Sequence, residues 1–461
     1  MWMPDISQEK GPTYLAVANA YAEAIERGDL PAGTRLPPQR DLAKELGVTV
    51  GTISRAYALM SKRELVSGEV GRGTFVRGTR QDAPYTDFSS ERTVSRAIDL
   101  ACFRAPVSSI NAIIAEAAVQ AANRSGPHPM HKYPPAAGLI SHRNDGAEWL
   151  SRYGLKVGGD QVLICGGAQL ALNVALNTFI RRGERVLGEA ISYAGLRAIC
   201  AIHEIELQGL EIDENGLVPA ALDQACRAGL GSTVVVQPTL HNPTTALMPL
   251  ERRREIAELA KKYDLLLIED DTAGGMLMDR PPPIATLAPD HTIYINSVSK
   301  CMSPALRLGY MAAPRQLVDR LERVLHTLSL GAPPLVSDVM SVLLSSGSAD
   351  RIIDMNFKET LQRQSIVAEI LGHNDIRSRP GAFFAWLQLP SYWQAHEFVA
   401  SALREGVNVT DGDNFLVDRG IPLNAVRISI DGAPGQDTLR HGLEILSRLL
   451  HQEPKAWMAV V

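Results

Sequence analysis

The chain has 461 residues, of which 45% are hydrophobic and 21% charged, and this composition excludes a disordered or fibrous protein. The length predicts two or three domains. A formal net charge of −5 excludes a uniformly basic nucleic-acid binder, but residues 35–80 contain nine Lys/Arg and four Asp/Glu, a local net charge of +5. Such asymmetry is typical of a DNA-contacting module attached to a larger acidic body.

The five cysteines are scattered and include no C-x-x-C pair, so the sequence predicts neither a disulfide framework nor a metal cluster. The first ten residues lack the basic-then-apolar order of a signal peptide. No apolar run approaches the length of a membrane span. We therefore expect a cytoplasmic protein without a bound metal ion or a membrane partner.

Three helices are predicted near the N-terminus. Apolar residues over 14–25 recur at helical spacing and predict a helix that ends at Gly28. A short second helix is predicted over 37–47, with prolines near its start and a glycine at its end. After three more residues a third helix begins at Gly51, and the last two helices form a helix-turn-helix.

A β-hairpin follows the third helix. Its strands are predicted over 65–67 and 71–76, with a turn near Gly68-Glu69, and they form a two-stranded wing. The winged helix predicted in this way covers residues 1–78. Residues 79–97 are polar and have no periodicity, which predicts a linker.

The rest of the chain, residues 98–461, alternates short β-branched runs with helical segments. This alternation predicts an α/β domain with a mainly parallel sheet. The clearest runs are 161–164, 233–236, 265–268 and 292–295.

Three motifs in the first 78 residues are similar to the signature of GntR-type winged-helix regulators: the string Gly33–Ala43, the helix Val48–Tyr57 and the wing sequence Gly-Arg-Gly-Thr-Phe-Val. The N-terminal end of a recognition helix enters the major groove, where hydroxyl and guanidinium groups contact phosphates or base edges. For any single arginine a solvated surface position is an equally good interpretation. The candidate DNA-binding residues are Arg35, Arg40, Thr49, Thr52, Ser54, Arg55 and Arg72.

A lysine motif carries the chemistry of the larger domain. Lys300 ends the sequence Asn-Ser-Val-Ser-Lys after an apolar strand, and Arg307 lies seven residues further on. A lysine at the end of a buried strand loses its proton more easily and can form a Schiff base with a carbonyl group. Upstream, Gly166–Gln169 connects a strand to a helix, whose first N–H groups favour a phosphate. The candidate phosphate ligands are Ser297, Arg307, Gly167, Ala168 and Gln169.

The order of these motifs resembles that of fold-type I enzymes, and the resemblance implies pyridoxal 5′-phosphate (PLP) as the cofactor on Lys300. A carboxylate that ends a strand pairs with the pyridine nitrogen, and the resemblance favours Asp270 over Asp271. It further implies that Asn242 binds the ring hydroxyl and that Tyr193 stacks on the ring. Arg427 matches the arginine that binds a ligand α-carboxylate.

Three of the matches also have a structural interpretation. Tyr193 fits a core aromatic residue as well as a ring-stacking one. Tyr133 is either a packing residue or a contact to the phosphate of the neighbouring subunit. His241 is either a loop histidine with its hydrogen bonds satisfied or part of the cofactor segment.

A GntR-type winged helix joined to an aminotransferase-like domain is the layout of MocR-type regulators, which the chain resembles over essentially its whole length. The resemblance implies a head-to-tail homodimer with its sites at the subunit interface and double-stranded DNA as a partner. PLP, or PLP carrying an amino acid or amine as an aldimine, is then the effector, and it must bind two conformations unequally.

The sequence departs from this family at two places. Thr272 stands where the family often has tyrosine, and Ala-Gly-Gly-Met over 273–276 replaces acidic and aromatic residues. In addition, the segment 241–245 resembles that of true aminotransferases more than that of the regulators. The first departure argues against efficient aminotransferase chemistry, and the second preserves an asparagine suited to PLP.

The leading hypothesis is a PLP-responsive transcription factor, with a DNA-binding domain (1–78), a linker (79–97) and an effector and dimerisation domain (98–461). The alternative is a working aminotransferase that carries a DNA-binding head, and retention of Lys300 and Arg427 keeps it open. A third hypothesis, a winged-helix repressor whose large domain only dimerises, requires every cofactor residue to be a relic.

Overall fold

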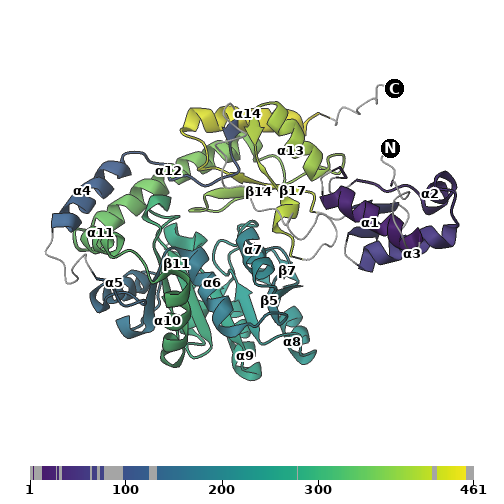
Figure 1. Ribbon diagram of the computed structural model, residues 1–461. Coiled ribbons are helices and arrows are strands. Elements are labelled where there is room, and N and C mark those ends of the chain that lie inside the picture. Colours follow the sequence, from purple (N-terminus) through teal and green to yellow (C-terminus); the bar gives the residue numbers. More distant parts are fainter. Residues whose placement is uncertain are drawn as a thin grey trace. The chain divides into compact units, whose positions relative to one another are not determined.

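The computed structural model describes residues 4, 13–26, 29–30, 34–62, 65–69, 73–76, 97–123, 132–277, 279–417 and 423–452. The chain divides into two compact units, Met1–Tyr85 and Thr86–Val461 (Figure 1). In the described ranges no single helix is long and apolar enough to cross a membrane. Two consecutive helices, Arg315–Ser329 and Pro334–Ser345, meet the length and composition criteria only as a pair bent by 120°.

The first unit is built from three helices and a hairpin around one core. Its elements are α1 Thr13–Glu26, α2 Gln39–Glu45, α3 Val50–Lys62, β1 Val66–Glu69 and β2 Gly73–Val76. Helix α3 contacts α1, α2 and β1, and its residues Ile53, Ala56 and Met60 are buried at helical spacing. The Tyr57 hydroxyl donates to the Pro37 carbonyl oxygen at 2.7 Å, which connects α3 to the start of α2.

The predicted winged helix-turn-helix is present, with one correction in the hairpin. Strand Val66–Glu69 pairs antiparallel with Gly73–Val76 over its whole length. The turn predicted near Gly68-Glu69 is therefore wrong, because cross-strand pairing continues through both residues. Arg72 lies outside the described residues, as does the predicted linker 79–97 except for its last residue.

A seven-stranded sheet forms the centre of the second unit (Figure 1). The strand order is β4-β12-β11-β10-β9-β5-β6, and only the pairs that involve β12 are antiparallel. The mainly parallel α/β sheet predicted from the sequence is thus confirmed, and the four predicted runs fall on β4, β9, β10 and β11. The strands are β4 Val162–Cys165, β5 Arg185–Glu189, β6 Glu206–Leu210, β9 Thr233–Val236, β10 Leu266–Asp270, β11 Thr292–Ser297 and β12 Gly309–Ala312.

Helices cover both faces of this sheet. In β11, Ile293 and Ile295 pack on one face with α6, α7 and α10, whereas Tyr294 packs on the other face with α4, α5 and α11. Burial on both faces explains why the strands read as continuous apolar runs. The helices are α4 Ile110–Asn123, α5 Ile140–Ser151, α6 Ala168–Phe179, α7 Ala194–Ile202, α8 Pro219–Arg227, α9 Leu250–Tyr263, α10 Arg315–Ser329 and α11 Pro334–Ser345.

A smaller antiparallel sheet, in the order β13-β14-β17-β16, shares a second core with α12, α13 and α14. Strand β3, near the start of the unit, pairs in parallel with β15, so the start of this unit lies beside its C-terminal part. These elements are β3 Ile98–Asp99, α12 Ser348–Leu371, β13 Ile376–Arg377, β14 Phe384–Gln388, α13 Ala395–Arg404, β15 Val407–Asn408, β16 Thr410–Asp411, β17 Ala425–Ser429 and α14 Gln436–Leu450.

A buried arginine in α9 fixes the segment that follows β9. The Arg253 guanidinium donates to the backbone oxygens of Met248, Pro282 and Pro238 at 2.9–3.1 Å. It also donates to Thr239 Oγ1 at 2.9 Å, and its side chain is fully buried. One planar group with several donors therefore satisfies acceptors that come from three parts of the chain.

We expect Arg253→Lys to lower the free energy of unfolding by about 3 kcal/mol, because a single ammonium group leaves buried carbonyl oxygens without donors. Arg254→Lys is the matched control: Arg254 is the next residue, is exposed and pairs with Glu251, and we expect a change below about 0.5 kcal/mol. Urea unfolding followed by circular dichroism measures both, and equal losses would contradict the role of Arg253.

Candidate functional site

Side chains from neighbouring strands meet at one edge of the large sheet. Asp270 is the last residue of β10, and Lys300 follows the end of β11 by three residues. Tyr193 and Asn242 lie beyond the ends of β5 and β9. Because the carboxyl ends of parallel strands share one edge, these four residues come to the same place, where open α/β sheets bind their ligands.

Lys300 has an amine of lowered basicity. Its Nζ lies 4.3 Å from the ring centre of Phe103 and 5.5 Å from that of Phe383. Burial and the nearby cations Arg427 and Arg307 lower the pKa of Lys300 to about 8. More of this lysine is therefore neutral near pH 7 than of an exposed lysine, and the neutral amine is the nucleophilic form.

Asp270 is a buried carboxylate held by two donors. Gln237 Nε2 donates to its Oδ2 at 2.9 Å, and the backbone N–H of Thr272 donates to its Oδ1 at 3.0 Å. Burial raises the pKa of Asp270, and the hydrogen bonds from Thr272 and Gln237 lower it. Asp271 differs, because it forms a buried ion pair with Arg280 at 2.6 Å. Of the two carboxylates, Asp270 is the one that the described residues leave without a cation.

Arg427, on β17, reaches the same edge from the smaller sheet. Its Nη1 donates to Asn242 Oδ1 at 3.1 Å and its Nη2 to the Ala101 carbonyl oxygen at 2.7 Å, while its buried Nε has no hydrogen-bond partner. Burial lowers the pKa of Arg427 to about 10, and the other groups that act on it are Cys102 and Tyr193. The guanidinium stays charged at neutral pH without a carboxylate beside it, which suits an anionic ligand.

The glycine turn before α6 lies against Arg307. Gly167 has a φ of +100°, and a Cβ at this position would lie 3.1 Å from Arg307 Nη2. Arg307 Nη2 donates to the Gly166 carbonyl oxygen at 3.2 Å. A Cβ on Gly309 of β12 would lie 2.9 Å from Ala168 N. The start of α6 thus brings helix N–H groups and a guanidinium together without room for side chains, and this arrangement suits a phosphate.

Tyr193 lies directly before α7. A Cβ on Gly195 would collide with the Tyr193 ring and would lie 2.6 Å from Gln169 Oε1, so a glycine is required beneath them. Burial and the nearby Asp270 raise the pKa of Tyr193, and Arg427 lowers it. The tyrosine therefore lies within electrostatic reach of both the buried carboxylate and the buried guanidinium.

The two serines before Lys300 differ in their hydrogen bonds. Ser297 Oγ donates to the Leu308 carbonyl oxygen at 3.0 Å and accepts from Ser299 N at 3.2 Å. The Ser299 hydroxyl is buried and has no hydrogen-bond partner. The hydroxyl available to a ligand in this turn is thus that of Ser299, a residue of the same motif that is not among the predicted phosphate ligands.

His241 and Tyr133 differ in burial. His241 is fully buried, with Nδ1 2.8 Å from Thr244 Oγ1 and Nε2 3.0 Å from the Ile191 carbonyl oxygen, so it holds its own loop. Tyr133 is 82% exposed and is therefore not a core residue of its own chain. Across the described ranges, no group of three or more His, Cys, Asp or Glu residues is placed to hold a metal ion.

In the first unit, most candidate DNA-binding residues are at the surface. The exposed ones are Arg35, Arg40, Thr49, Ser54 and Arg55. Thr52 is half-buried, and its backbone N–H donates to Thr49 Oγ1 at 3.1 Å. Thr49 thus caps the start of α3, a role that is independent of DNA. Arg35, Arg40 and Arg55 therefore lie at the surface of this unit.

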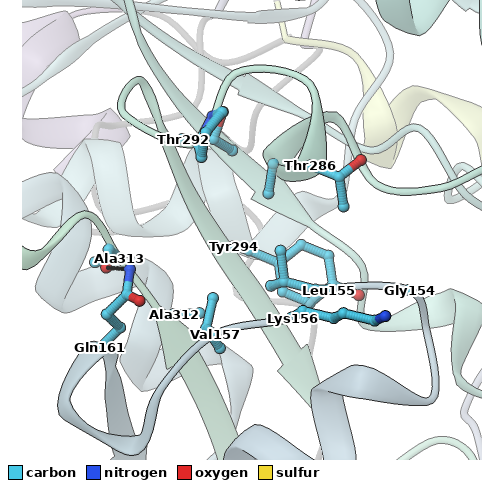
Figure 2. Close-up of a pocket in the computed structure, with 12 residues that line it drawn as sticks. Gly154, Leu155, Lys156, Val157, Gln161, Thr286, Thr292, Tyr294, Ala312 and Ala313 are labelled. Carbon is cyan, nitrogen blue, oxygen red and sulfur yellow. Dashed lines mark hydrogen bonds between the residues drawn. The ribbon is translucent and has the colours of Figure 1, made fainter.

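A cavity of about 440 Å³ lies at the other end of β11 (Figure 2). Thr292, where β11 begins, and Tyr294 line it, whereas Lys300 follows the far end of the strand. Figure 2 shows Gln161 in its wall, hydrogen-bonded to the backbone of Ala313 at 3.3 Å. Thr292 Oγ1 also donates to a backbone oxygen. The cavity is therefore separate from the Lys300 site, and these two polar groups have partners within the protein.

Two family models match the chain. Residues 13–76 match the bacterial regulatory proteins of the gntR family, and residues 107–446 match aminotransferase class I and II. The two matches correspond to the winged helix and to the unit that contains Lys300.

Similar proteins carry the same combination over their full length. The HTH-type transcriptional regulator YdeF of Bacillus subtilis is 30% identical over 97% of this chain and 96% of its own. The HTH-type pyridoxine biosynthesis transcriptional regulator PdxR of Corynebacterium glutamicum is 29% identical over 92% of each chain.

Among solved structures, the α-aminoadipate aminotransferase LysN of Thermus thermophilus has a TM-score of 0.69 at 24% identity, over 77% of this chain and 92% of its own. This likeness shows the aminotransferase fold of the second unit. Taken with the two family matches and the full-length relatives, it means that the chain belongs to the GntR-type transcriptional regulators with an aminotransferase class I/II domain, the MocR-type family.

Proposed function

We propose that this DNA-binding regulator holds PLP on Lys300 and senses PLP itself, or an amino acid or amine bound with it. The observation that carries the proposal is the amine of Lys300, whose pKa is lowered to about 8 at the sheet edge where Asp270, Asn242, Arg307 and Arg427 also meet. A lysine used only for packing or solubility has no need of this environment.

The residues present fit PLP group by group. The start of α6, Arg307 and the free Ser299 hydroxyl suit its phosphate, and the cationless carboxylate of Asp270 suits its ring nitrogen. Asn242 keeps its amide N–H groups for the ring hydroxyl, since its oxygen accepts from Arg427. When bound, PLP supplies an aldehyde carbon that amines attack and a ring that withdraws electrons.

Arg427 gives a ligand carboxylate a way to alter the protein. The unpartnered Nε of Arg427 can donate to a carboxylate, which then competes with Asn242 and Ala101 for the same guanidinium. Ala101 belongs to the segment 98–103, which directly follows the predicted linker, and Phe103 of this segment lies over Lys300 Nζ. Ligand binding therefore changes the contacts that Arg427 and Lys300 make with the segment that leads to the DNA-binding unit. Such a change is required if the ligand is to bind two conformations of the protein unequally.

The quaternary arrangement and the location are part of the proposal. We propose a cytoplasmic homodimer, because paired winged helices read two half-sites. The exposed Tyr133 is suited to contact a second subunit. A working aminotransferase remains the second candidate, favoured by the unpartnered Arg427 Nε.

The full-length protein should bind DNA upstream of its own or a neighbouring gene, and PLP should change that affinity severalfold. Lys300→Ala should keep DNA binding and lose the response to PLP, whereas Lys156→Ala, an exposed lysine beside the separate cavity, should keep both. Fluorescence anisotropy with labelled DNA measures these affinities. Failure of the wild-type protein to bind any such DNA would overturn the proposal.

The rate at which PLP attaches to the protein should rise with pH about a midpoint near 8, because the neutral Lys300 amine is the nucleophile and its pKa is lowered to about 8. Arg427→Gln removes a neighbouring cation and should move the midpoint upward. Rapid-mixing absorbance measures the rate. A wild-type midpoint near that of a free lysine, about 10.4, would contradict the lowered pKa.

Arg55→Ala should weaken DNA binding about tenfold and reduce the slope of log affinity against log salt by about one, if this exposed arginine on α3 neutralises a phosphate. Arg440→Ala is the control, because Arg440 lies on α14 and pairs with Glu369 at 2.6 Å. An unchanged salt slope in the Arg55 variant would remove Arg55 from the interface.

A further inference from the structure

Gln237, directly after β9, contacts two of the residues proposed to hold the cofactor. Its side-chain Nε2 donates to Asp270 Oδ2 at 2.9 Å, and its Oε1 accepts from the backbone N–H of Asn242 at 3.3 Å. The side chain is 92% buried, being 8% exposed. Both ends of one amide are thus engaged, one with each proposed partner of the cofactor ring.

The backbone of Gln237 is itself fixed from behind. Its N–H donates at 3.0 Å to Oε2 of Glu189, the last residue of β5. Glu189 is fully buried, and the same oxygen lies 3.5 Å from His241 Nε2. The ends of β5, β9 and β10 are therefore joined through one glutamine, which leaves its amide little freedom to turn.

The surroundings of Asp270 favour its protonated form, so the hydrogen bond donated by the Gln237 amide is needed to keep it ionised. Asp270 is buried, and both the Asp271 carboxylate and the Tyr193 side chain lie within electrostatic reach of it. Burial and Asp271 both favour the protonated form of Asp270. Thr272 and Gln237 supply the hydrogen bonds that oppose this, and Gln237 reaches Asp270 from another strand.

We infer that Gln237 is a positioning residue that holds Asp270 as the anion facing the ring nitrogen of PLP and fixes the Asn242 loop. The inference rests on the proposed function. Only a side chain that donates and accepts at once can do both tasks: methionine of similar length does neither, and glutamate keeps the acceptor but loses the donor. An ionised Asp270 keeps a proton on the ring nitrogen, and the electron-poor ring makes the attached Lys300 nitrogen less basic.

The test uses the full-length protein loaded with PLP, whose visible band is titrated with pH. Gln237→Met should move the midpoint of this titration about one unit to higher pH, because Asp270 takes up a proton and the ring nitrogen loses its charge. Gln237→Glu should move it further, since it places a second carboxyl group against Asp270. The affinity for PLP, measured by equilibrium titration, should fall about tenfold in both variants.

Thr360→Val is the matched control, because Thr360 Oγ1 donates to the buried Asp431 at the same distance, 2.9 Å, in the smaller sheet's core. Thr360→Val should lower the stability of the protein without moving the midpoint of the PLP titration, because Thr360 has only a structural role. An unchanged midpoint in a folded, PLP-loaded Gln237→Met or Gln237→Glu variant would overturn the role of Gln237. Absence of a visible band in the wild-type protein would instead overturn the proposed function.

Discussion

An excess of positive charge at one edge of the large sheet is the constraint on which the rest of the site depends. Arg427 and Arg307 both lie within electrostatic reach of Lys300, and burial together with these two cations lowers the pKa of Lys300 to about 8. Asp270 is also buried at this edge, where Gln237 and Thr272 donate hydrogen bonds to it. Bringing these cations together is unfavourable without an anion, so a phosphate and a carboxylate would each stabilise the arrangement.

The same cations connect the site to the start of the unit. Arg427 donates to the Ala101 carbonyl oxygen at 2.7 Å, and Lys300 Nζ lies 4.3 Å from the Phe103 ring. Both contacts are made to one short segment that follows the predicted linker. On the proposed function, a ligand that neutralises either cation weakens the hold of that cation on this segment and so alters DNA binding without any contact between ligand and DNA.

The residues and elements that the sequence predicts correctly are those that belong to local motifs. Lys300, Asp270 and Arg307 stand at or just after strand ends, where type and spacing are readable in the sequence, and the winged helix is likewise local. The position of the hairpin turn is not readable in the sequence, because strand pairing through Glu69 depends on the partner strand. The role of Gln237 is not readable in the sequence, because its partner Asp270 is 33 residues away and the sequence does not show which strands are neighbours.

The sequence departs from the family at residues 272–276, and packing explains part of this departure. A Cβ on Gly275 would lie 2.9 Å from Cys301 Cβ, and a Cβ on Gly274 would collide with Arg280 and Asp271. The small residues after Thr272 therefore let this stretch pack against the turn that carries Lys300. This packing accounts for the glycines, and Thr272 contributes a hydrogen bond that lowers the pKa of the buried Asp270.

On the proposed function, ligand chemistry at Lys300 controls DNA binding, and the ligand is not turned over. The most direct test follows the visible absorbance of the PLP-loaded protein as single amino compounds are added, with DNA affinity and oxo-acid release measured on the same sample. We expect one compound to shift the band to a new, persistent position, to change DNA affinity and to release no oxo acid. Continuous release of an oxo acid with unchanged DNA affinity would contradict the claim and identify an aminotransferase.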